Sequence, residues 1–282
     1  MSNEPDSWIP EIDSALSKWS QGDCTIGDDC WFVTRFDAQR PLAQSSKEVA
    51  AADADADLAE SAVSGFVVVT QTCDLVRSCA DRPFLEISPL VKVNAELLAE
   101  IKRLKRPNYA YIAGVADRSL VADLDRVMTV EKAVVAAWER IQGCQSDTDV
   151  RSLSEALARK RSRFAFPDDF TSFAQKLQKR MQDKHEKASP EGEALRALQQ
   201  IRVSAAPAWD ADTVELTFSF IRAEQDDRFQ DKEWHELLKV WLELLPAVGR
   251  FKANGSVVTL KDMTAKEYTQ SDRLDLDRLS SH

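Results

Sequence analysis

Two short apolar runs separated by a polar turn, within residues 65–90, place the strongest constraint on what this chain can fold into. Residues 66–69 read Phe-Val-Val-Val, and aromatic and β-branched side chains suit a packed strand. Residues 84–90 predict a second buried strand. Thr-Gln-Thr-Cys-Asp follows the first run at positions 70–74, where the chain leaves the core. Functional groups are often mounted at such strand ends, so we expect this turn to line a site.

The segments on either side of this stretch predict further secondary structure. Apolar residues recur at helical spacing in residues 7–19, 93–104 and 131–142. Residues 38–63 are rich in Ala, Asp and Ser and contain no aromatic residue, which predicts a surface insertion that is disordered or weakly helical. We therefore expect residues 1–143 to form a barrel-like domain, a small β-barrel with helical decorations.

The remainder of the chain predicts two further parts. Residues 144–200 predict a helical segment. Apolar and polar residues alternate strictly in residues 214–221, which predicts a strand with one buried face. An amphipathic helix is predicted over residues 231–248, and residues 201–282 then form a small α/β module of order β-β-α-β. The predicted fold class is α+β.

The charge balance narrows the classes of partner. The net charge is −10, with 47 acidic and 37 basic residues. Such a surface disfavours non-specific binding of nucleic acid or an anionic membrane, but it leaves room for a local basic patch. No apolar run reaches the roughly 20 residues that cross a bilayer, and the first residues lack the features of a signal peptide. We therefore expect a cytoplasmic protein with no membrane partner, and its five cysteines fit reduced thiols.

Cys73 and Asp74 carry the most reactive groups of the central turn. A catalytic thiolate needs a base beside it. The only histidines are His185, His235 and His282, so a Cys/His pair could form only across domains. The alternative is that Cys73 is a small buried residue and that Asp74 caps a turn.

Cysteine spacing leaves a metal site open as an alternative. Cys24 and Cys30 form one C-x5-C pair, and Cys73 and Cys79 form another. Thiolate zinc sites usually have two to four residues between paired ligands, although two strand turns could converge on one metal. We predict no cofactor. The chain also lacks GxGxxG, P-loop, HExxH and GxSxG motifs, which removes the usual support for nucleotide-driven, zincin and α/β-hydrolase chemistry.

Three groups of basic residues, at positions 102–106, 159–163 and 176–187, could together follow a phosphate backbone. Phe164 and Phe166 lie beside the second group, and aromatic rings stack on bases. The alternative is that these groups are solvated helix faces and that both rings join the core. The candidate nucleic-acid-binding residues are Lys102, Arg103, Lys105, Arg106, Arg159, Lys160, Arg161 and Arg163.

Four short segments in the first 143 residues resemble the PemK/MazF-type toxins. They are Gln-Gly-Asp at 21–23, Val-Val-Val-Thr at 67–70, Ile-Ser-Pro-Leu at 87–90 and the segment 119–127. The resemblance implies a small barrel and a bacterial endoribonuclease that works without metal. It also implies a basic residue before the central strand and a hydroxyl after the Pro-Leu strand. Arg35 and Arg40 are the candidates for the basic residue, although the long insertion separates them from the central strand. Val91 occupies the position where the resemblance implies a hydroxyl side chain.

Three hypotheses of function follow. The first is a bacterial toxin- or defence-type protein that binds or cleaves RNA through the barrel. Its partners would be RNA, through a local basic patch, and a protein. The second is a non-catalytic interaction module of a larger complex, in which the barrel and the helix at 231–248 present partner surfaces. The third is a thiol- or metal-dependent enzyme centred on Cys73. The candidate catalytic residues are Arg35, Arg40, Arg82, Thr70, Thr72, Cys73 and Asp74.

Overall fold

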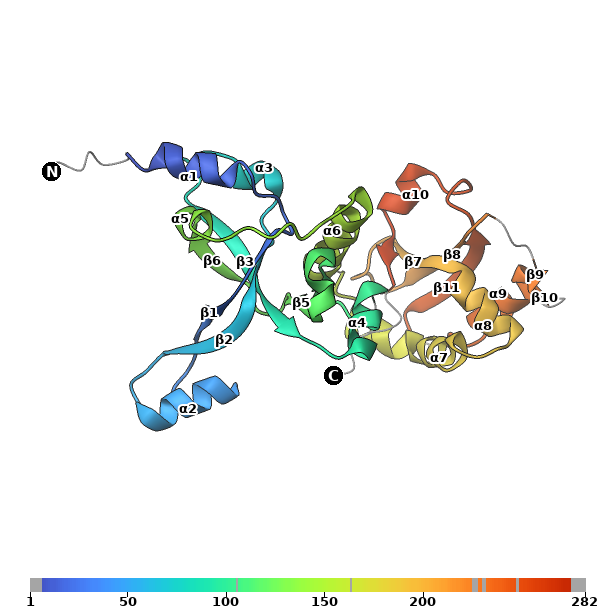
Figure 1. Cartoon of the computed structure of the whole chain (residues 1–282). Helices are drawn as coiled ribbons and strands as arrows, with labels where there is room; N and C mark the ends of the chain where they lie inside the picture. Colours follow the sequence, from blue (N-terminus) through green and yellow to red (C-terminus); the bar gives the residue numbers. More distant parts are fainter. Residues whose placement is uncertain are drawn as a thin grey trace. The chain divides into compact units, whose positions relative to one another are not determined.

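The computed structural model describes residues 7–104, 106–162, 164–224, 228–229, 232–246 and 249–274. The chain is α+β, as the sequence predicts, and it divides into two compact units, Met1–Ser162 and Arg163–His282 (Figure 1). This boundary differs from the predicted boundaries at 143 and 200. The reason lies in the cores, because helix α6 (Asp147–Arg161) contributes Leu153 and Ala156 to the first unit. Helices α7 and α8 supply residues to the core of the second.

The strands of the first unit form open, antiparallel sheets. Strand order is β1-β2-β3-β5-β4, with β6 also pairing to β3. The small barrel is not confirmed, because β3 pairs with β6 through its first half and with β5 through its second half, and the sheet does not close. The bounds are β1 Cys24–Arg35, β2 Leu58–Val68, β3 Phe84–Lys92, β4 Tyr109–Tyr111, β5 Leu120–Asp123 and β6 Met128–Glu131.

Strand β2 is buried on both faces at its end, which explains its continuous apolar run. Phe66 and Val68 pack into one hydrophobic cluster with Leu16, whereas Val67 and Val69 pack into another with Leu90. Alternate residues of a strand point to opposite faces, so the run 66–69 serves two cores at once. The helices are α1 Ile9–Leu16, α2 Gln44–Ala52, α3 Thr72–Leu75, α4 Ala95–Lys102, α5 Lys132–Ala136 and α6, with a 3₁₀ turn at Ala113–Arg118.

Residues 38–63 differ from the sequence prediction of a disordered or weakly helical insertion. Helix α2 lies within them, and β2 begins at Leu58 and pairs with β1 as far as Arg35. The two strands form a long hairpin that carries α2 near its end (Figure 1). The segment has few strong strand formers, so its pairing with β1, rather than local propensity, decides its conformation.

The second unit is built on a four-stranded sheet of order β11-β8-β7-β12. Its β7-β8-α9-β11 core has the predicted β-β-α-β order, with β11 parallel to β8. Bounds of the strands are β7 Leu198–Ala206, β8 Val214–Arg222, β9 Arg228–Phe229, β10 Lys232–Glu233, β11 Phe251–Val258 and β12 Asp272–Arg273. The helices are α7 Asp168–His185, α8 Pro190–Ala197, α9 Trp234–Leu242 and α10 Ala265–Thr269.

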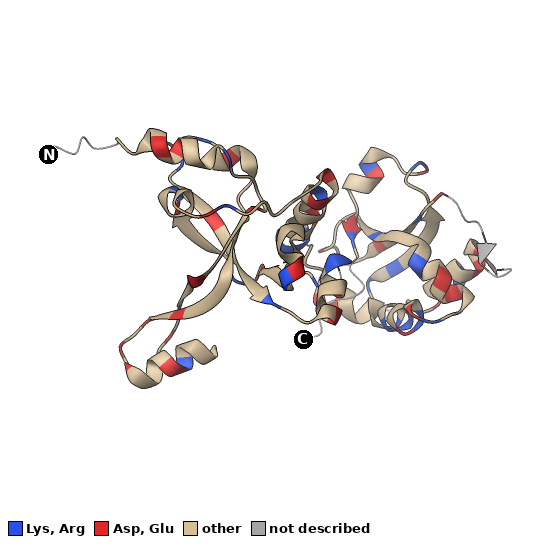
Figure 2. Ribbon diagram, in the orientation of Figure 1, with Lys and Arg blue, Asp and Glu red and all other residues tan. Residues whose placement is uncertain are grey.

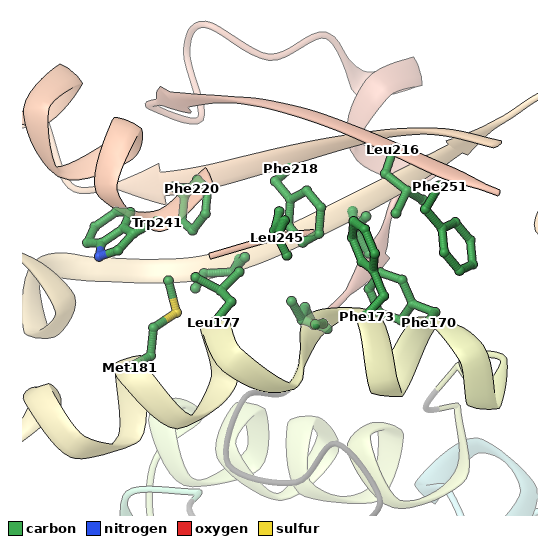
Figure 3. Packing of buried hydrophobic residues seen from close by; sticks show 14 of the residues in the cluster. Phe170, Phe173, Leu177, Met181, Leu216, Phe218, Phe220, Trp241, Leu245 and Phe251 are labelled. Atoms are coloured by element: carbon green, nitrogen blue, oxygen red, sulfur yellow. The ribbon is translucent and has the colours of Figure 1, made fainter. Parts of the chain in front are cut away.

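One aromatic-rich core holds the second unit together. The apolar stripe of α7, from Phe170 to Met181, faces Phe218 and Phe220 of β8 (Figure 3). Trp241 of α9 packs on Phe220, with ring centroids 5.0 Å apart. None of the described helices has the length and apolar character needed to cross a membrane.

Candidate functional site

The end of β2, helix α3, the start of β3 and the last turns of α6 surround a cleft of about 590 Å³ in the first unit. Four residues predicted from sequence line this cleft: Thr70, Asp74 and Arg82 of the catalytic candidates, and Arg161 of the nucleic-acid-binding candidates. Glu86, which the sequence did not single out, also lines it. The strand-end turn is therefore part of a concave site, as expected.

Hydrogen bonds fix the backbone of the turn. The Thr70 hydroxyl accepts a hydrogen bond from the backbone N–H of Glu86 at 2.6 Å. The Thr72 hydroxyl accepts one from the backbone N–H of Gln21 at 3.0 Å, and the Gln21 side chain donates to the carbonyl of Val69 at 2.8 Å. These contacts join three separate segments and position the turn. Each hydroxyl still carries a proton that it can donate.

The cleft carries balanced charges with one free cation. Arg161 of α6 forms an ion pair with Glu86 of β3 at 2.7 Å. Asp74 lies 3.6 Å from Arg77. The guanidinium of Arg82, by contrast, has neither an ion-pair nor a side-chain hydrogen-bond partner among the described residues, although it lines the cleft and is exposed. An anionic ligand could therefore bind Arg82 without first breaking an existing ion pair of that guanidinium.

An exposed aromatic ring lies beside this arginine. Phe84 lines the cleft, and 59% of its surface is exposed. It opens strand β3, two residues after Arg82, and pairs with Glu131 of β6. A flat apolar surface and a free cation thus face the same space.

A buried lysine supports the turn from the protein side. Lys132 is only 1% exposed, and its Nζ donates to the carbonyl oxygens of Asp74 at 3.1 Å and Arg77 at 2.5 Å. Burial lowers the pKa of this ammonium group, while the nearby carboxylate of Asp13 acts in the opposite direction. Asp13 itself accepts a hydrogen bond from the backbone N–H of Cys79 at 2.8 Å. The sequence did not reveal this role, because Lys132 lies in a segment that predicts a longer amphipathic helix.

Arg35 and Arg40 lie away from the cleft. Arg35 ends β1 opposite Leu58 and pairs with Asp57 at 3.0 Å, whereas Arg40 pairs with Asp37 at 2.8 Å. The cleft end of β1 is Cys24, opposite Val67. Leu58, opposite Arg35, lies nine residues from Val67 along β2, so at about 3.3 Å per residue Arg35 is roughly 30 Å from this end of the hairpin. The structure therefore does not bring these candidate catalytic residues together with the turn.

Within the described part of the first unit, the thiol candidate has no histidine beside it. Cys73 is exposed, contrary to the expectation that it is buried, and its Sγ lies 3.7 Å from the amide oxygen of Gln71. The two described histidines, His185 and His235, belong to the second unit, and His282 lies outside the described residues. Over the described ranges, no group of three or more His, Cys, Asp or Glu residues is placed to hold a metal ion.

Most of the predicted nucleic-acid-binding residues have partners within the first unit. Arg106 pairs with Glu100, Lys160 pairs with Asp125, and the ammonium of Lys102 lies over the ring of Tyr111. Arg159 donates to the carbonyl of Leu104, and Arg103 is exposed. Lys105 and Arg163 lie outside the described residues.

The ribbon of the first unit carries both basic and acidic residues (Figure 2), and α6 has acidic residues in its first turn and Arg159, Lys160 and Arg161 in its last turn. Phe166 packs against Phe170 of the second unit's core, with ring centroids 4.8 Å apart. Phe164 is closest to Phe166 at 5.0 Å. The rings proposed to stack on bases thus contact each other and the core, and Phe84 is the aromatic residue that lines the cleft.

Comparison of the chain with protein-family models, curated proteins and solved structures gave no match.

Proposed function

We propose that the first unit binds single-stranded RNA in this cleft and cleaves it there. The observation that carries the proposal is the pairing of a free guanidinium, Arg82, with an exposed ring, Phe84, in one cleft. Guanidinium groups bind phosphate oxygens in a bidentate geometry, and aromatic rings stack on unpaired bases. A volume of about 590 Å³ lies within the range of small-ligand sites, so it suits a nucleotide unit.

The charge balance of the cleft favours a short footprint on the strand. Asp74 and Glu86 offset Arg82 and Arg161, and the surrounding basic residues already have partners. A long phosphate backbone would gain little from such a surface. We therefore expect one or two phosphates to be neutralised, with a correspondingly shallow dependence of affinity on salt.

The ion pair of Glu86 and Arg161 supports a cleavage reaction by internal transfer. The ribose 2′-hydroxyl gives its proton to the Glu86 carboxylate as its oxygen bonds to phosphorus, and the bond to the 5′-oxygen breaks. The leaving oxygen takes a proton from water, and the hydroxide that remains takes the proton held on Glu86, which restores the carboxylate. The products are a 2′,3′-cyclic phosphate and a 5′-hydroxyl. Arg82 and Arg161 stabilise the negative charge that develops on the phosphorane oxygens.

Like the PemK/MazF-type toxins that it resembles, the chain would act on RNA, but other arginines would supply the positive charge. Arg82 and Arg161 take the role that the resemblance gives to Arg35 or Arg40. A metal-independent endoribonuclease of this kind, in a bacterial cytoplasm, would act as a toxin- or defence-type protein.

Binding is tested with fluorescently labelled octaribonucleotides and the matching DNA. Arg82→Ala and Phe84→Ala should each weaken RNA binding about tenfold, which corresponds to about 1.4 kcal/mol and is the scale of one stacked base. Arg103→Ala is the matched control, because Arg103 is exposed in the same unit and does not line the cleft. An equal loss in the Arg82 and Arg103 variants would contradict the proposal, since it would indicate a diffuse charge effect.

Cleavage is tested separately from binding. Glu86→Gln should leave RNA bound but lower the cleavage rate by about 10²-fold or more, the scale of a lost general base. A strand with a single 2′-deoxynucleotide should resist cleavage at that position only. Tight binding without any 2′,3′-cyclic product in the unmodified protein would limit the function to RNA binding.

A further inference from the structure

Strand β1 is the outer strand of its sheet and leaves a long edge free. The backbone N–H of Phe36 donates to the carbonyl of Asp57 at 2.9 Å, and this bond shows which residues of β1 are hydrogen-bonded to β2. In an antiparallel pair, every second residue bonds to the partner strand and the others point outward. Trp31, Val33 and Arg35 therefore direct their backbone N–H and C=O groups away from β2.

Within the first unit, no other described segment pairs with this edge. Backbone hydrogen bonds from outside the hairpin reach Cys24, which pairs with Ile141, but none of those described reaches Trp31, Val33 or Arg35. An unpaired edge of this length is a template for pairing with another strand unless charges or a covering element block it.

The side chains along the edge are apolar and exposed on one face. Trp31 is 49% exposed and Val33 is 41% exposed, whereas Phe32 between them is buried in the core. The cross-strand neighbours of Trp31 and Val33 are Ala62 and Glu60, which are also exposed. This face thus combines unsatisfied backbone groups with apolar surface.

The edge is complementary to itself in one register. When β1 is paired antiparallel with β1 of a second copy and Phe32 faces Phe32, Trp31 lies opposite Val33 and Asp29 lies opposite Arg35. The outward backbone groups of Trp31 and Val33 then meet in hydrogen-bonded positions, as an antiparallel ladder requires. Opposite charges facing each other across strands add stability, and apolar pairs do the same.

Neighbouring registers lack this match. Moving the pairing by one step toward the end of β1 places Val33 opposite itself and Asp29 opposite Asp37, so two carboxylates meet. Moving it the other way places Trp31 opposite itself and Asp29 opposite Val33, so Arg35 has no acidic partner in the second copy and keeps only Asp57 of its own chain. Charge therefore selects the register centred on Phe32.

We propose that two copies of this chain pair through β1, antiparallel about Phe32, to form one continuous sheet across the dimer. Each interface contains two Trp31–Val33 contacts and two Asp29–Arg35 ion pairs, because a twofold axis repeats every contact. This dimer is independent of RNA binding, since the edge residues lie along the hairpin and the cleft is lined by other residues.

The experiment is a charge reversal followed by sedimentation velocity of the full chain. Asp29→Arg and Arg35→Asp each place like charges at both symmetric ion pairs, so each should weaken self-association about tenfold or more. An equimolar mixture of the two variants should associate again, because each charge then meets its opposite in the mixed dimer. The double variant should also restore the dimer.

The controls use the neighbouring charge pair of the hairpin. Asp37→Arg and Arg40→Asp change the same charges just beyond the strand, so both variants should associate like the unmodified protein. Circular dichroism confirms that each variant is folded. A protein that stays monomeric at its highest soluble concentration would overturn the proposal. A dimer that is insensitive to the Asp29 and Arg35 reversals, or that fails to reform in the mixture, would do the same.

Discussion

Lys132 is the residue on which the shape of the cleft most directly depends. Its ammonium group is buried and donates hydrogen bonds to two backbone carbonyl oxygens, those of Asp74 and Arg77. Lys132→Met keeps the length of the side chain but leaves these acceptors unpaired. We expect the free energy of unfolding to fall by about 1–3 kcal/mol, the cost of orphaned buried polar groups, as measured by urea denaturation.

The matched control for this substitution is Lys47→Met, which removes an exposed lysine from α2. Surface changes of this kind usually alter stability by less than about 0.5 kcal/mol. If the two variants unfold at the same urea concentration, Lys132 is not holding the turn. A stable Lys132 variant with unchanged RNA affinity would lead to the same conclusion.

At the residue scale, the sequence pointed to the turn between two apolar runs, and two of its residues, Thr70 and Asp74, line the cleft. Arg82 and Arg161, which were chosen for their positive charge, line the same cleft. The ion pair of Glu86 with Arg161 was not predictable, since it joins a strand and a distant helix. No local pattern reports a contact that only the tertiary fold creates.

At the scale of elements, one buried carboxylate joins three helices of the second unit. Glu191 of α8 accepts two hydrogen bonds from Arg180 of α7, at 3.0 and 2.8 Å. It also accepts one from the indole N–H of Trp241 of α9 at 3.2 Å. Glu191→Gln removes the charge and one acceptor, so we expect unfolding to become easier by about 1–2 kcal/mol. Because Arg180 remains two-fifths exposed, solvent screening keeps the loss below that of a fully buried pair.

Glu215→Gln is the control for this network, because Glu215 lies on the exposed face of β8 in the same unit. Thermal unfolding followed by calorimetry should show a lower midpoint for the Glu191 variant alone. Equal midpoints would mean that the three helices are held by their apolar contacts without help from the carboxylate.

Elements were predictable where periodicity was strong and both partners of a contact were local. The alternation in residues 214–221 predicted β8, and α7 lies within residues 144–200, which were predicted to be helical. The predicted helix over 231–248 is present over a shorter range as α9, Trp234–Leu242, whereas Lys232–Glu233 form β10 and residues 243–246 are not helical. Residues 231, 247 and 248 lie outside the described part of the chain. The first half of β2 was missed, because its sequence becomes a strand only through pairing with β1.

On the scale of the whole molecule, each unit has its own hydrophobic core. The cluster around Phe170, Phe218 and Trp241 draws all its buried members from the second unit, and the two clusters of the first unit draw theirs from residues before 163. A segment with a complete core and its own sheet is expected to fold independently. The sequence did not place this boundary, because α6 has the composition of a solvated helix and its buried residues, Leu153 and Ala156, are few.

We therefore expect the fragment 163–282 to fold when it is produced alone. It should unfold cooperatively on heating, and Glu191→Gln should lower its midpoint by the same amount as in the full chain, because Arg180, Glu191 and Trp241 all lie within it. Calorimetry of the fragment, with and without the substitution, makes the comparison. A fragment without a cooperative transition, or with a transition that Glu191→Gln does not shift, would show that the core of the second unit is incomplete without the first 162 residues.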